Sequence, residues 1–432
     1  MMLLGEMNQV TLKKSTEDVT GRMGLGWVAH GMSHFGLDEI LDRRLPVGGE
    51  SNREIPARRK VMAAALSLIA GAQRIEDLEV LRADLGLLHA LGWEEMVSPD
   101  TLREHLKEKR HSGGLRKVNE ELVVKAMKQA SEQEFTYDND ATYFDSEKSP
   151  ATYSYQMRKQ FSGLIGFIAE LRLCNTVDFR PGNISPGTGI LNQLRKAVLQ
   201  AKGAGKRITR FRSDSAAHNE VIFRFCEGEG IRYFISLDKN AAVMECIKAL
   251  KPGAWQEIQD PDAKWVRKVE WSETVYATNK GSAMRMRVLR WLNPQPDLFE
   301  QERYCYHAIG TNDVGINAMA WLEFHNERMG SENFNKELKK GFNASYSPSH
   351  DFEMDRGYFL LNVLAYNIVQ VVKLFYLGES TKRWTIKTLR YWFIEVCGKI
   401  VRSGRRYTCK IINVTVATYE LFQRCWSVLR VV

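Results

Sequence analysis

Residues 135–142 read FTYDNDAT and begin a series of short β-like runs. The later runs lie at 164–170, 172–179, 208–212 and 231–237, and stretches with helical spacing lie at 190–202, 216–226 and 241–250. Three strands in succession, followed by helix, strand, helix and strand, are typical of an α/β sheet. We therefore predict that the centre of the chain forms an α/β core.

This order of elements is that of a ribonuclease H-like core, and a different pattern interrupts it. Apolar and polar residues alternate at 265–271, 284–291 and 304–309, which predicts antiparallel strands. The predicted fold class is α/β, with a ribonuclease H-like core interrupted by a β-strand insertion and with helical N-terminal and C-terminal regions. The predicted parts are residues 1–130 (helical), 131–251 (first part of the core), 252–312 (β insertion), 313–345 (last part of the core) and 346–432 (basic and helical).

Helical signals dominate both ends of the chain. Ser98 followed by Pro99 predicts a helix start, with Ser98 as the N-cap. The residues after it form either a compact helical module that touches phosphates, or a solvated helix face followed by a linker at 112–114. Near the other end, polar residues interrupt the most apolar run, 358–377, which predicts a buried helix and no membrane contact.

The charge of the chain is concentrated near its C-terminus. The whole sequence carries +9, and from Thr381 onward eleven basic residues stand against two acidic ones. A basic segment of this kind favours a polyanionic partner. Seven cysteines without a CxxC pair favour neither a disulfide framework nor a zinc module, and the N-terminus lacks a secretory signal pattern, so we expect a cytoplasmic protein.

Asp138 and Asp140 lie two residues apart in the first predicted strand, so their side chains share one face. Burying an unpaired carboxylate is costly, so a metal or a basic partner is expected there unless the run lies at an exposed strand end. Asp214 follows the strand at 208–212, at the sheet edge where ligands gather. The alternative for Asp214 is a simple helix N-cap.

Glu332 lies in a predicted helix in which Arg328, Glu332, either Asn335 or Lys336, and Lys339 fall at spacings of three and four residues. These side chains therefore line one face of the helix. Ordinary salt pairs on a solvated helix would give the same spacing. If the helix lies at the end of the sheet, its Glu332 joins Asp140 and Asp214 in a cluster of hard oxygen ligands that suits Mg²⁺ or Mn²⁺.

At these residues the sequence resembles the DDE transposases of bacterial insertion sequences. His325, Arg328, Glu332 and Lys339 have the spacing of the family's Tyr-Arg-Glu-Lys signature, with His in place of Tyr. Further resemblance to the thirteen-eighty insertion-sequence group lies at 78–84, 180–183, 238–240, 364–367 and 402–406. The segment 145–156, DSEKSPATYSYQ, departs from that group because it lacks a His-Gly-x-Gln pattern.

The resemblance implies a transposase that binds terminal inverted repeats and performs metal-dependent DNA cleavage and strand transfer. It implies two Mg²⁺ or Mn²⁺ ions held by Asp140, Asp214 and Glu332, with Asp138 as the rival for the first position. It also implies double-stranded DNA as partner, end binding by residues 1–130, and a homodimer on DNA. The implied DNA contacts are Arg328, Lys339, His325, Arg402, Arg405 and Arg406.

Two other functions remain open from the sequence. One is a two-metal nuclease that cleaves DNA without strand transfer, and the other is a DNA-binding relative that no longer cuts. For the tryptophans of the β insertion, Trp265, Trp271 and Trp291, stacking on a flipped base and packing in a core are the two alternatives.

Overall fold

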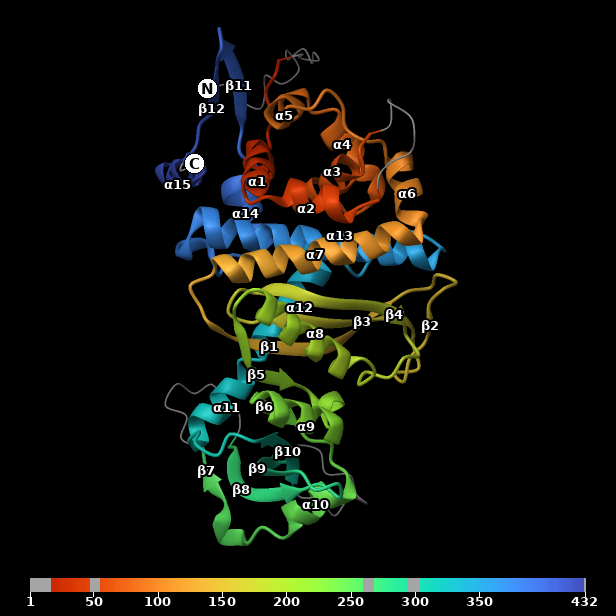
Figure 1. Cartoon of the computed structure of the whole chain (residues 1–432), viewed down its shortest axis with the longest axis vertical. Coiled ribbons are helices and arrows are strands. Elements are labelled where there is room, and N and C mark those ends of the chain that lie inside the picture. The colour runs from red at the N-terminus through yellow and green to blue at the C-terminus, as the bar shows by residue number, and fades with distance from the viewer. Residues whose placement is uncertain (1–16, 47–54, 259–267, 294–303, 431–432) are drawn as a thin grey trace, which may run out of the picture.

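The computed structural model describes residues 17–46, 55–258, 268–293 and 304–430. A ten-stranded mixed sheet forms the centre of the molecule (Figure 1). Its strand order is β2-β3-β1-β5-β6-β10-β9-β8-β7, with β4 on β3. The strands are β1 (Glu134–Asp145), β2 (Thr152–Tyr153), β3 (Lys159–Ile168), β4 (Leu173–Pro181), β5 (Arg207–Ser213), β6 (Arg232–Ser236), β7 (Gln256–Glu257), β8 (Glu270–Ala277), β9 (Ala283–Leu292) and β10 (Tyr304–Thr311).

The predicted ribonuclease H-like core is present. Strands β4, β3 and β1 are antiparallel neighbours, and β5 and β6 continue the sheet parallel to β1. The helices that follow β4, β5 and β6 are α8 (Ile190–Gly203), α9 (Glu220–Glu229) and α10 (Ala241–Lys248). The prediction of one helix over 216–226 is wrong, because a short 3-10 turn, η3 (Ser215–Ala217), comes first and Asn219 caps a new helix through Val221 N.

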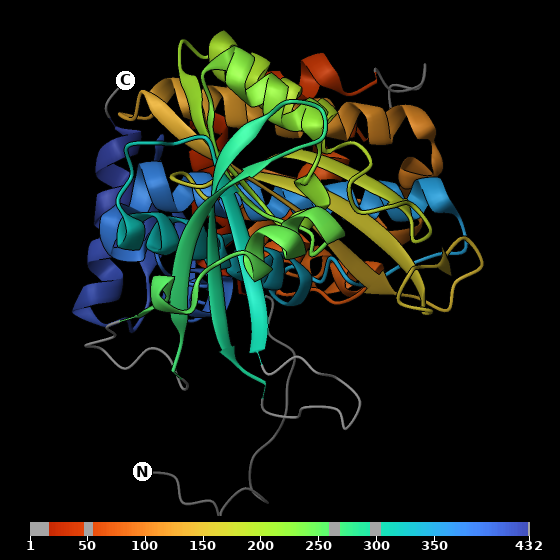
Figure 2. The same cartoon turned by 90° about the horizontal axis from the view of Figure 1, so that it is seen from below.

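The strands of the predicted β insertion extend the same sheet and do not form a separate layer. Strand β10 pairs antiparallel with β6, which places β9, β8 and β7 beyond the edge of the core, at the bottom of Figure 1 and in front in Figure 2. Trp271 and Trp291 are partly buried against a second small core around Trp321. The packing alternative therefore describes these two tryptophans, while Trp265 lies outside the described residues.

Helices from the N-terminal third cover one end of the sheet. They are α1 (Met23–His34), α2 (Leu37–Arg44), α3 (Ala57–Ala70), α4 (Leu78–Arg82), α5 (Leu85–Leu91), α6 (Pro99–Lys107) and α7 (Lys109–Gln129). The Ser98 side chain caps α6 at Thr101 N, as predicted. The predicted linker at 112–114 is wrong, because α7 runs through it. Gly114 allows close packing, since a Cβ there would lie 2.9 Å from Arg44 O.

The apolar run near the C-terminus is a helix inside the protein. Helix α13 (Phe352–Val372) and the π-helical turn η5 (Lys373–Leu377) are long and apolar enough to cross a membrane, but 89% of the most apolar window is buried. Asn367 binds the Cys174 amide and carbonyl of β4, each at 2.9 Å. Asn367 therefore ties the helix to the sheet, and apolar residues of both chain ends and of the sheet form one core.

The C-terminal region is not all helical, which corrects the prediction for 346–432. Strands β11 (Gly398–Ser403) and β12 (Arg406–Ile411) form a hairpin that projects at the top of Figure 1. The hairpin holds Arg402, Arg405 and Arg406. The remaining helices are α11 (Ala318–Asn326), α12 (Met329–Gly341), α14 (Ile386–Leu389) and α15 (Val416–Leu429).

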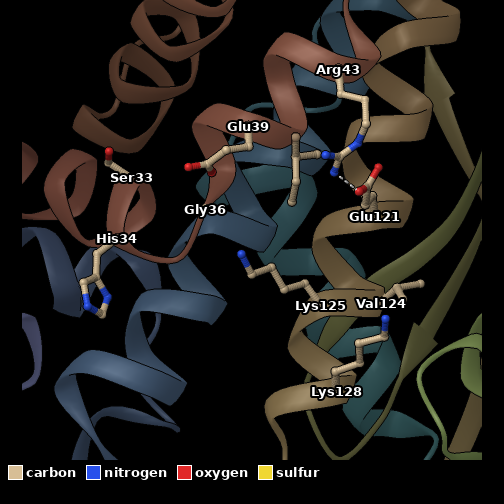
Figure 3. Close-up of a pocket in the computed structure, with 10 residues that line it drawn as sticks. Ser33, His34, Gly36, Glu39, Arg43, Glu121, Val124, Lys125 and Lys128 are labelled. Carbon is tan, nitrogen blue, oxygen red and sulfur yellow. Dashed lines mark hydrogen bonds and ion pairs between the residues drawn. The ribbon is translucent and has the colours of Figure 1, made fainter. Parts of the chain in front are cut away.

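A cleft of about 500 Å³ lies between α2 and α7 (Figure 3). Arg43 and Glu121 pair on one wall, and Lys125 and Lys128 extend from α7. No residue of the predicted metal or DNA site lines this cleft, so it is separate from the acidic residues described next.

Candidate active site

Asp140 and Asp214 meet at the same edge of the sheet because β1 and β5 are parallel neighbours. Their register pairs Asn139 with Ser213, so Asp140 on β1 lies beside Asp214, the first residue after β5. Asp214 Oδ1 accepts a hydrogen bond of 3.1 Å from Ala216 N and so caps the η3 turn. Asp214 is therefore an N-cap through Oδ1, as the alternative predicted. Its capping role does not prevent Asp214 from also belonging to the acidic site.

Helix α12 brings the third carboxylate to this edge. Asn335 Nδ2 donates to Asp140 Oδ2 at 3.0 Å, and Arg328 Nη1 lies 3.9 Å from Asp140 Oδ1. Arg328 Nη2 also donates to Glu332 Oε1 at 3.0 Å. One turn further on, Lys339 Nζ donates to Tyr143 O at 3.0 Å. The predicted face of the helix is thus turned toward β1.

Arg328 is the cation that links the acidic groups. Burial raises the pKa of Asp140 to about 6, and the charges of Asp214 and Glu332 add to this rise, while Arg328 opposes it. Burial also raises the pKa of Asp214, where nearby Asp238 adds to the effect and Arg328 again opposes it. Several carboxylates therefore share one guanidinium, which leaves the site short of positive charge.

The donor set of this site fits a divalent cation. Asp140, Asp214 and Glu332 supply hard oxygen ligands, and Asn335 Oδ1 is buried beside them without a hydrogen-bond partner. In the part of the chain that the structure describes, however, no group of three His, Cys, Asp or Glu side chains is placed to hold a metal ion. Glu332 is exposed and paired with Arg328, so it would have to turn from that pair to join the aspartates.

The raised pKa of Asp140 predicts a pH-dependent effect of metal on stability. The folded protein holds this proton more tightly than the unfolded chain, so the associated stability is present at low pH and is lost as the pH rises through about 6. At pH 7.5 without metal, we expect Asp140→Asn to raise the free energy of unfolding by on the order of 1–2 kcal/mol. Thermal unfolding of both proteins at pH 5 and pH 7.5 measures this difference.

The same experiment with Mg²⁺ gives its control. Added Mg²⁺ should raise the unfolding temperature of the original protein at pH 7.5 and do much less at pH 5, where Asp140 is protonated. Asp140→Asn should respond weakly at both pH values. A metal response of Asp140→Asn equal to that of the original chain would contradict the assignment of this carboxylate.

Asp138 points into a different environment from Asp140. Its carboxylate is 1% exposed and accepts from Arg212 Nε at 2.6 Å and Arg212 Nη2 at 2.9 Å. Arg212 also donates to Phe324 O and Glu327, which tie β5 to the segment before α12. Asp138 thus belongs to a buried ion pair with Arg212. This arginine is the basic partner that the sequence called for but did not identify.

His325 is not placed to touch DNA, which corrects the predicted contact. The residue is 4% exposed, and its Nε2 lies 3.3 Å from Ser236 Oγ. Burial, with the nearby charges of His307 and Arg328, lowers its pKa to about 3. A neutral, buried imidazole cannot contribute a cation to a phosphate contact, and the helical spacing of 325–339 gave no sign of this burial.

The other predicted contacts form two separate groups. Arg328 and Lys339 lie beside the acidic residues, where β1, β5 and α12 meet near the centre of Figure 1. Arg402, Arg405 and Arg406 are exposed on the β11–β12 hairpin at the top of that view, away from the acidic residues. The bond from Asn335 to Asp140 was not predicted, although its place on the same helix face was the signal for it.

The match to a family profile points the same way as the acidic residues. Residues 4–431 match the profile of the family described as Transposase DDE domain group 1. No curated protein matches. One similar solved structure is the piggyBac transposase in a synaptic complex with hairpin DNA, with a TM-score of 0.44 and 11% identity. That likeness covers 79% of this chain and 74% of the other.

Proposed function

The chain belongs to the group 1 family of DDE-domain transposases, and on that premise we propose that it cuts DNA at the terminal inverted repeats of an insertion sequence and joins the ends to target DNA. The observation that carries this proposal is the meeting of Asp140, Asp214 and Glu332 around Arg328. The narrower assignment to the thirteen-eighty group remains a prediction from the sequence.

The family generally uses divalent metal ions. We propose that this chain uses two Mg²⁺ or Mn²⁺ ions, with Asp140, Asp214 and Glu332 as their ligands. When bound, such ions lower the pKa of the attacking hydroxyl or water and stabilise the departing oxygen. The mutual repulsion of the carboxylates supports this proposal, because a cation would relieve it.

The chain's own cations would hold the DNA backbone at this place. Arg328 already reaches two carboxylates, and it can exchange Glu332 for a phosphate when Glu332 turns toward a metal. Lys339 uses one of its three N–H donors on Tyr143 O, so two remain for a phosphate oxygen. Burial lowers the pKa of Lys339, and the charge of Asp140 opposes that change and helps keep the ammonium protonated.

The hairpin arginines supply the third part of the proposed DNA contact. Arg405 and Arg406 are exposed at the tip, and the ion pairs found in the described residues do not use them. We expect Arg405→Ala with Arg406→Ala to weaken binding to all duplex sequences alike and to reduce the slope of log affinity against log salt by about 2. Binding titrations between 50 and 200 mM salt, roughly the range in which phosphate contacts are most visible, measure this slope.

The matched control keeps the charge and changes only the side chain. The pair Arg405→Lys with Arg406→Lys should retain most of the salt slope, because each ammonium still releases a counterion from the duplex. A salt slope unchanged by the alanine pair would show that the hairpin does not contact DNA.

The function itself is tested on labelled inverted-repeat DNA with purified protein and Mg²⁺. Joined products identify a transposase, whereas cleaved ends without joined products identify the two-metal nuclease. Binding without any cleavage identifies the inactive relative. We further propose that residues 1–130 bind the transposon end and that two copies of the chain assemble on DNA, which a gel-shift series with one and two ends would show.

A further inference from the structure

We propose that Asn335 supplies its amide oxygen as a further ligand of the divalent cation at Asp140, and this inference rests on the proposed function. Asn335 lies on α12, between Glu332 and Lys339, and is 5% exposed. Its Nδ2 donates to Asp140 Oδ2 at 3.0 Å. The other atom of the amide, Oδ1, is buried without a hydrogen-bond partner among the described residues.

The buried amide oxygen is unusual because most buried polar atoms have a partner. An acceptor that is buried without one costs free energy, and an ion is one of the groups that can satisfy it. Amide oxygens of Asn are among the hard donors that bind divalent cations in proteins. The bond lengths of the amide place Oδ1 within roughly 5 Å of Asp140 Oδ2. Asn335 therefore brings an unused oxygen to the acidic site.

The spacing between Asn335 and Asp140 fits two ligands of one ion. Neighbouring oxygens around an octahedral Mg²⁺ lie about 2.8–3.0 Å apart, since each is about 2.0–2.1 Å from the metal. The amide atom that faces Asp140 Oδ2 is 3.0 Å away from it. This atom is Nδ2, and a turn of the amide by about 180° about χ2 puts Oδ1 in the same place. Two facing oxygens repel each other, so that arrangement is favourable only when both bind a cation.

Turning the amide would break only one hydrogen bond that the structure shows. Oδ1 has no donor to lose, and the bond from Nδ2 would be replaced by the shared cation. The helix need not move, because it is fixed to the sheet on both sides of Asn335. The ring of Phe334 packs on Phe167 of β3 with centroids 5.4 Å apart, and Lys339 Nζ donates to Tyr143 O at 3.0 Å.

Asn335 reaches Asp140 in an arrangement in which Glu332 does not. Glu332 is exposed, and its carboxylate accepts from Arg328 at 3.0 Å. Asn335 is already in contact with Asp140, which lies beside Asp214. The amide can therefore fill a ligand position at the aspartates while Glu332 still holds Arg328. Without a cation, the N–H donor of the same amide favours the charged form of Asp140, which is the form that binds metal.

The test is the binding of Mn²⁺ to the whole chain, alone and on a pre-cut inverted-repeat end, followed by the electron paramagnetic resonance signal of the free ion. A pre-cut end has no bond left to cleave, so binding is measured without turnover. Asn335→Leu keeps the size of the side chain and removes the oxygen, and it should weaken Mn²⁺ binding at least about tenfold. Asn335→Asp supplies a carboxylate oxygen at the same place and should bind Mn²⁺ at least as tightly as the original protein.

A matched variant separates a ligand from the effect of added charge. Asn333→Asp adds the same charge at an exposed position on α12, two residues away, and should leave Mn²⁺ binding within about twofold. Thermal unfolding in EDTA shows whether each variant is folded. If Asn335→Leu does not fold, the comparison of Asn335→Asp with Asn333→Asp decides, because both keep a polar side chain.

Three outcomes would overturn the role of Asn335 as a ligand. Asn335→Leu could bind Mn²⁺ like the original protein, or Asn333→Asp could tighten binding as much as Asn335→Asp. Alternatively, Asn335→Asp could bind as weakly as Asn335→Leu, which would make the amide a donor that only positions Asp140. The proposed function stands in all three cases if the original protein cleaves and joins inverted-repeat ends with Mg²⁺. Absence of Mn²⁺ binding to the original protein, alone and on DNA, contradicts both proposals.

Discussion

Asp214→Asn and Glu332→Gln should each reduce DNA cleavage and joining at least roughly a thousandfold, because residues that act as one catalytic unit fail together. Each change removes the charge of a proposed metal ligand and keeps the shape of the side chain. Asn is as good an N-cap as Asp, so Asp214→Asn should preserve the bond to Ala216 N. Glu332 is exposed, so its replacement should change stability little.

The measurement is the yield of cleaved and joined labelled ends with Mg²⁺, next to DNA binding in EDTA and a thermal unfolding curve. Glu323→Gln is a matched control, since Glu323 is an exposed carboxylate on the neighbouring helix α11. This control should retain full activity. If Asp214→Asn cleaves and joins as fast as the original protein, Asp214 has no place among the metal ligands. Loss of joining alone in Glu332→Gln would point to separate roles for the ligands in the two steps.

The core and the place of the acidic residues were predictable because they depend on local patterns. Strand and helix order determined the ribonuclease H-like topology, and parallel pairing of β1 with β5 then places Asp140 beside Asp214. Helical spacing placed Arg328 and Glu332 on one face with either Asn335 or Lys336, and the contacts of Arg328 and Asn335 with β1 confirm that face for these two residues. These features need only the period of a strand or helix and the rule that parallel strands end at one edge.

The errors came from contacts between distant segments. Burial of His325 depends on β6 and β10, which supply Ser236 and His307, and neither is visible from the spacing of one helix. The alternation of apolar and polar residues predicted strands at 252–312. It could not predict that they join the main sheet, because the pairing of β10 with β6 depends on β6 having a free edge. The glycine pair at 113–114 suggested a linker, but Gly114 is needed for the close approach of Arg44 to α7. That approach is a contact between distant segments, so the sequence near 113–114 does not reveal it.

The choice between Asp138 and Asp140 shows how pairing separates two carboxylates that the sequence treats alike. Both side chains lie on the same face of β1. Asp138 binds the buried Arg212, whereas Asp140 faces two other acidic groups. A neutralised carboxylate stabilises the fold, whereas a crowded one destabilises it until a cation binds. Neutralising each residue should therefore have opposite effects on the metal-free protein.

Asp138→Asn should lower the free energy of unfolding by on the order of 3 kcal/mol, because it leaves the guanidinium of Arg212 buried without its bidentate carboxylate. Arg212 is 4% exposed at its side chain, and in the variant the single amide oxygen of Asn replaces two carboxylate oxygens, so the exposed Glu327 is the only charged partner that remains among the described ion pairs. Urea unfolding compares this variant with Asp140→Asn, which lies two residues along the same strand. The expected order of stability without metal at pH 7.5 is Asp140→Asn, then the original protein, then Asp138→Asn.

Activity separates the same two residues independently of stability. Asp140→Asn should fold and bind DNA but not cleave it, while Asp138→Asn should retain some cleavage at temperatures where it remains folded. The combination Asp138→Leu with Arg212→Met removes both charges of the pair and should regain part of the lost stability, since no buried guanidinium is left without its partner. If Asp138→Asn is instead as stable as the original chain and inactive with Mg²⁺, then Asp138 is the first metal ligand and the Arg212 pair is incidental to the fold.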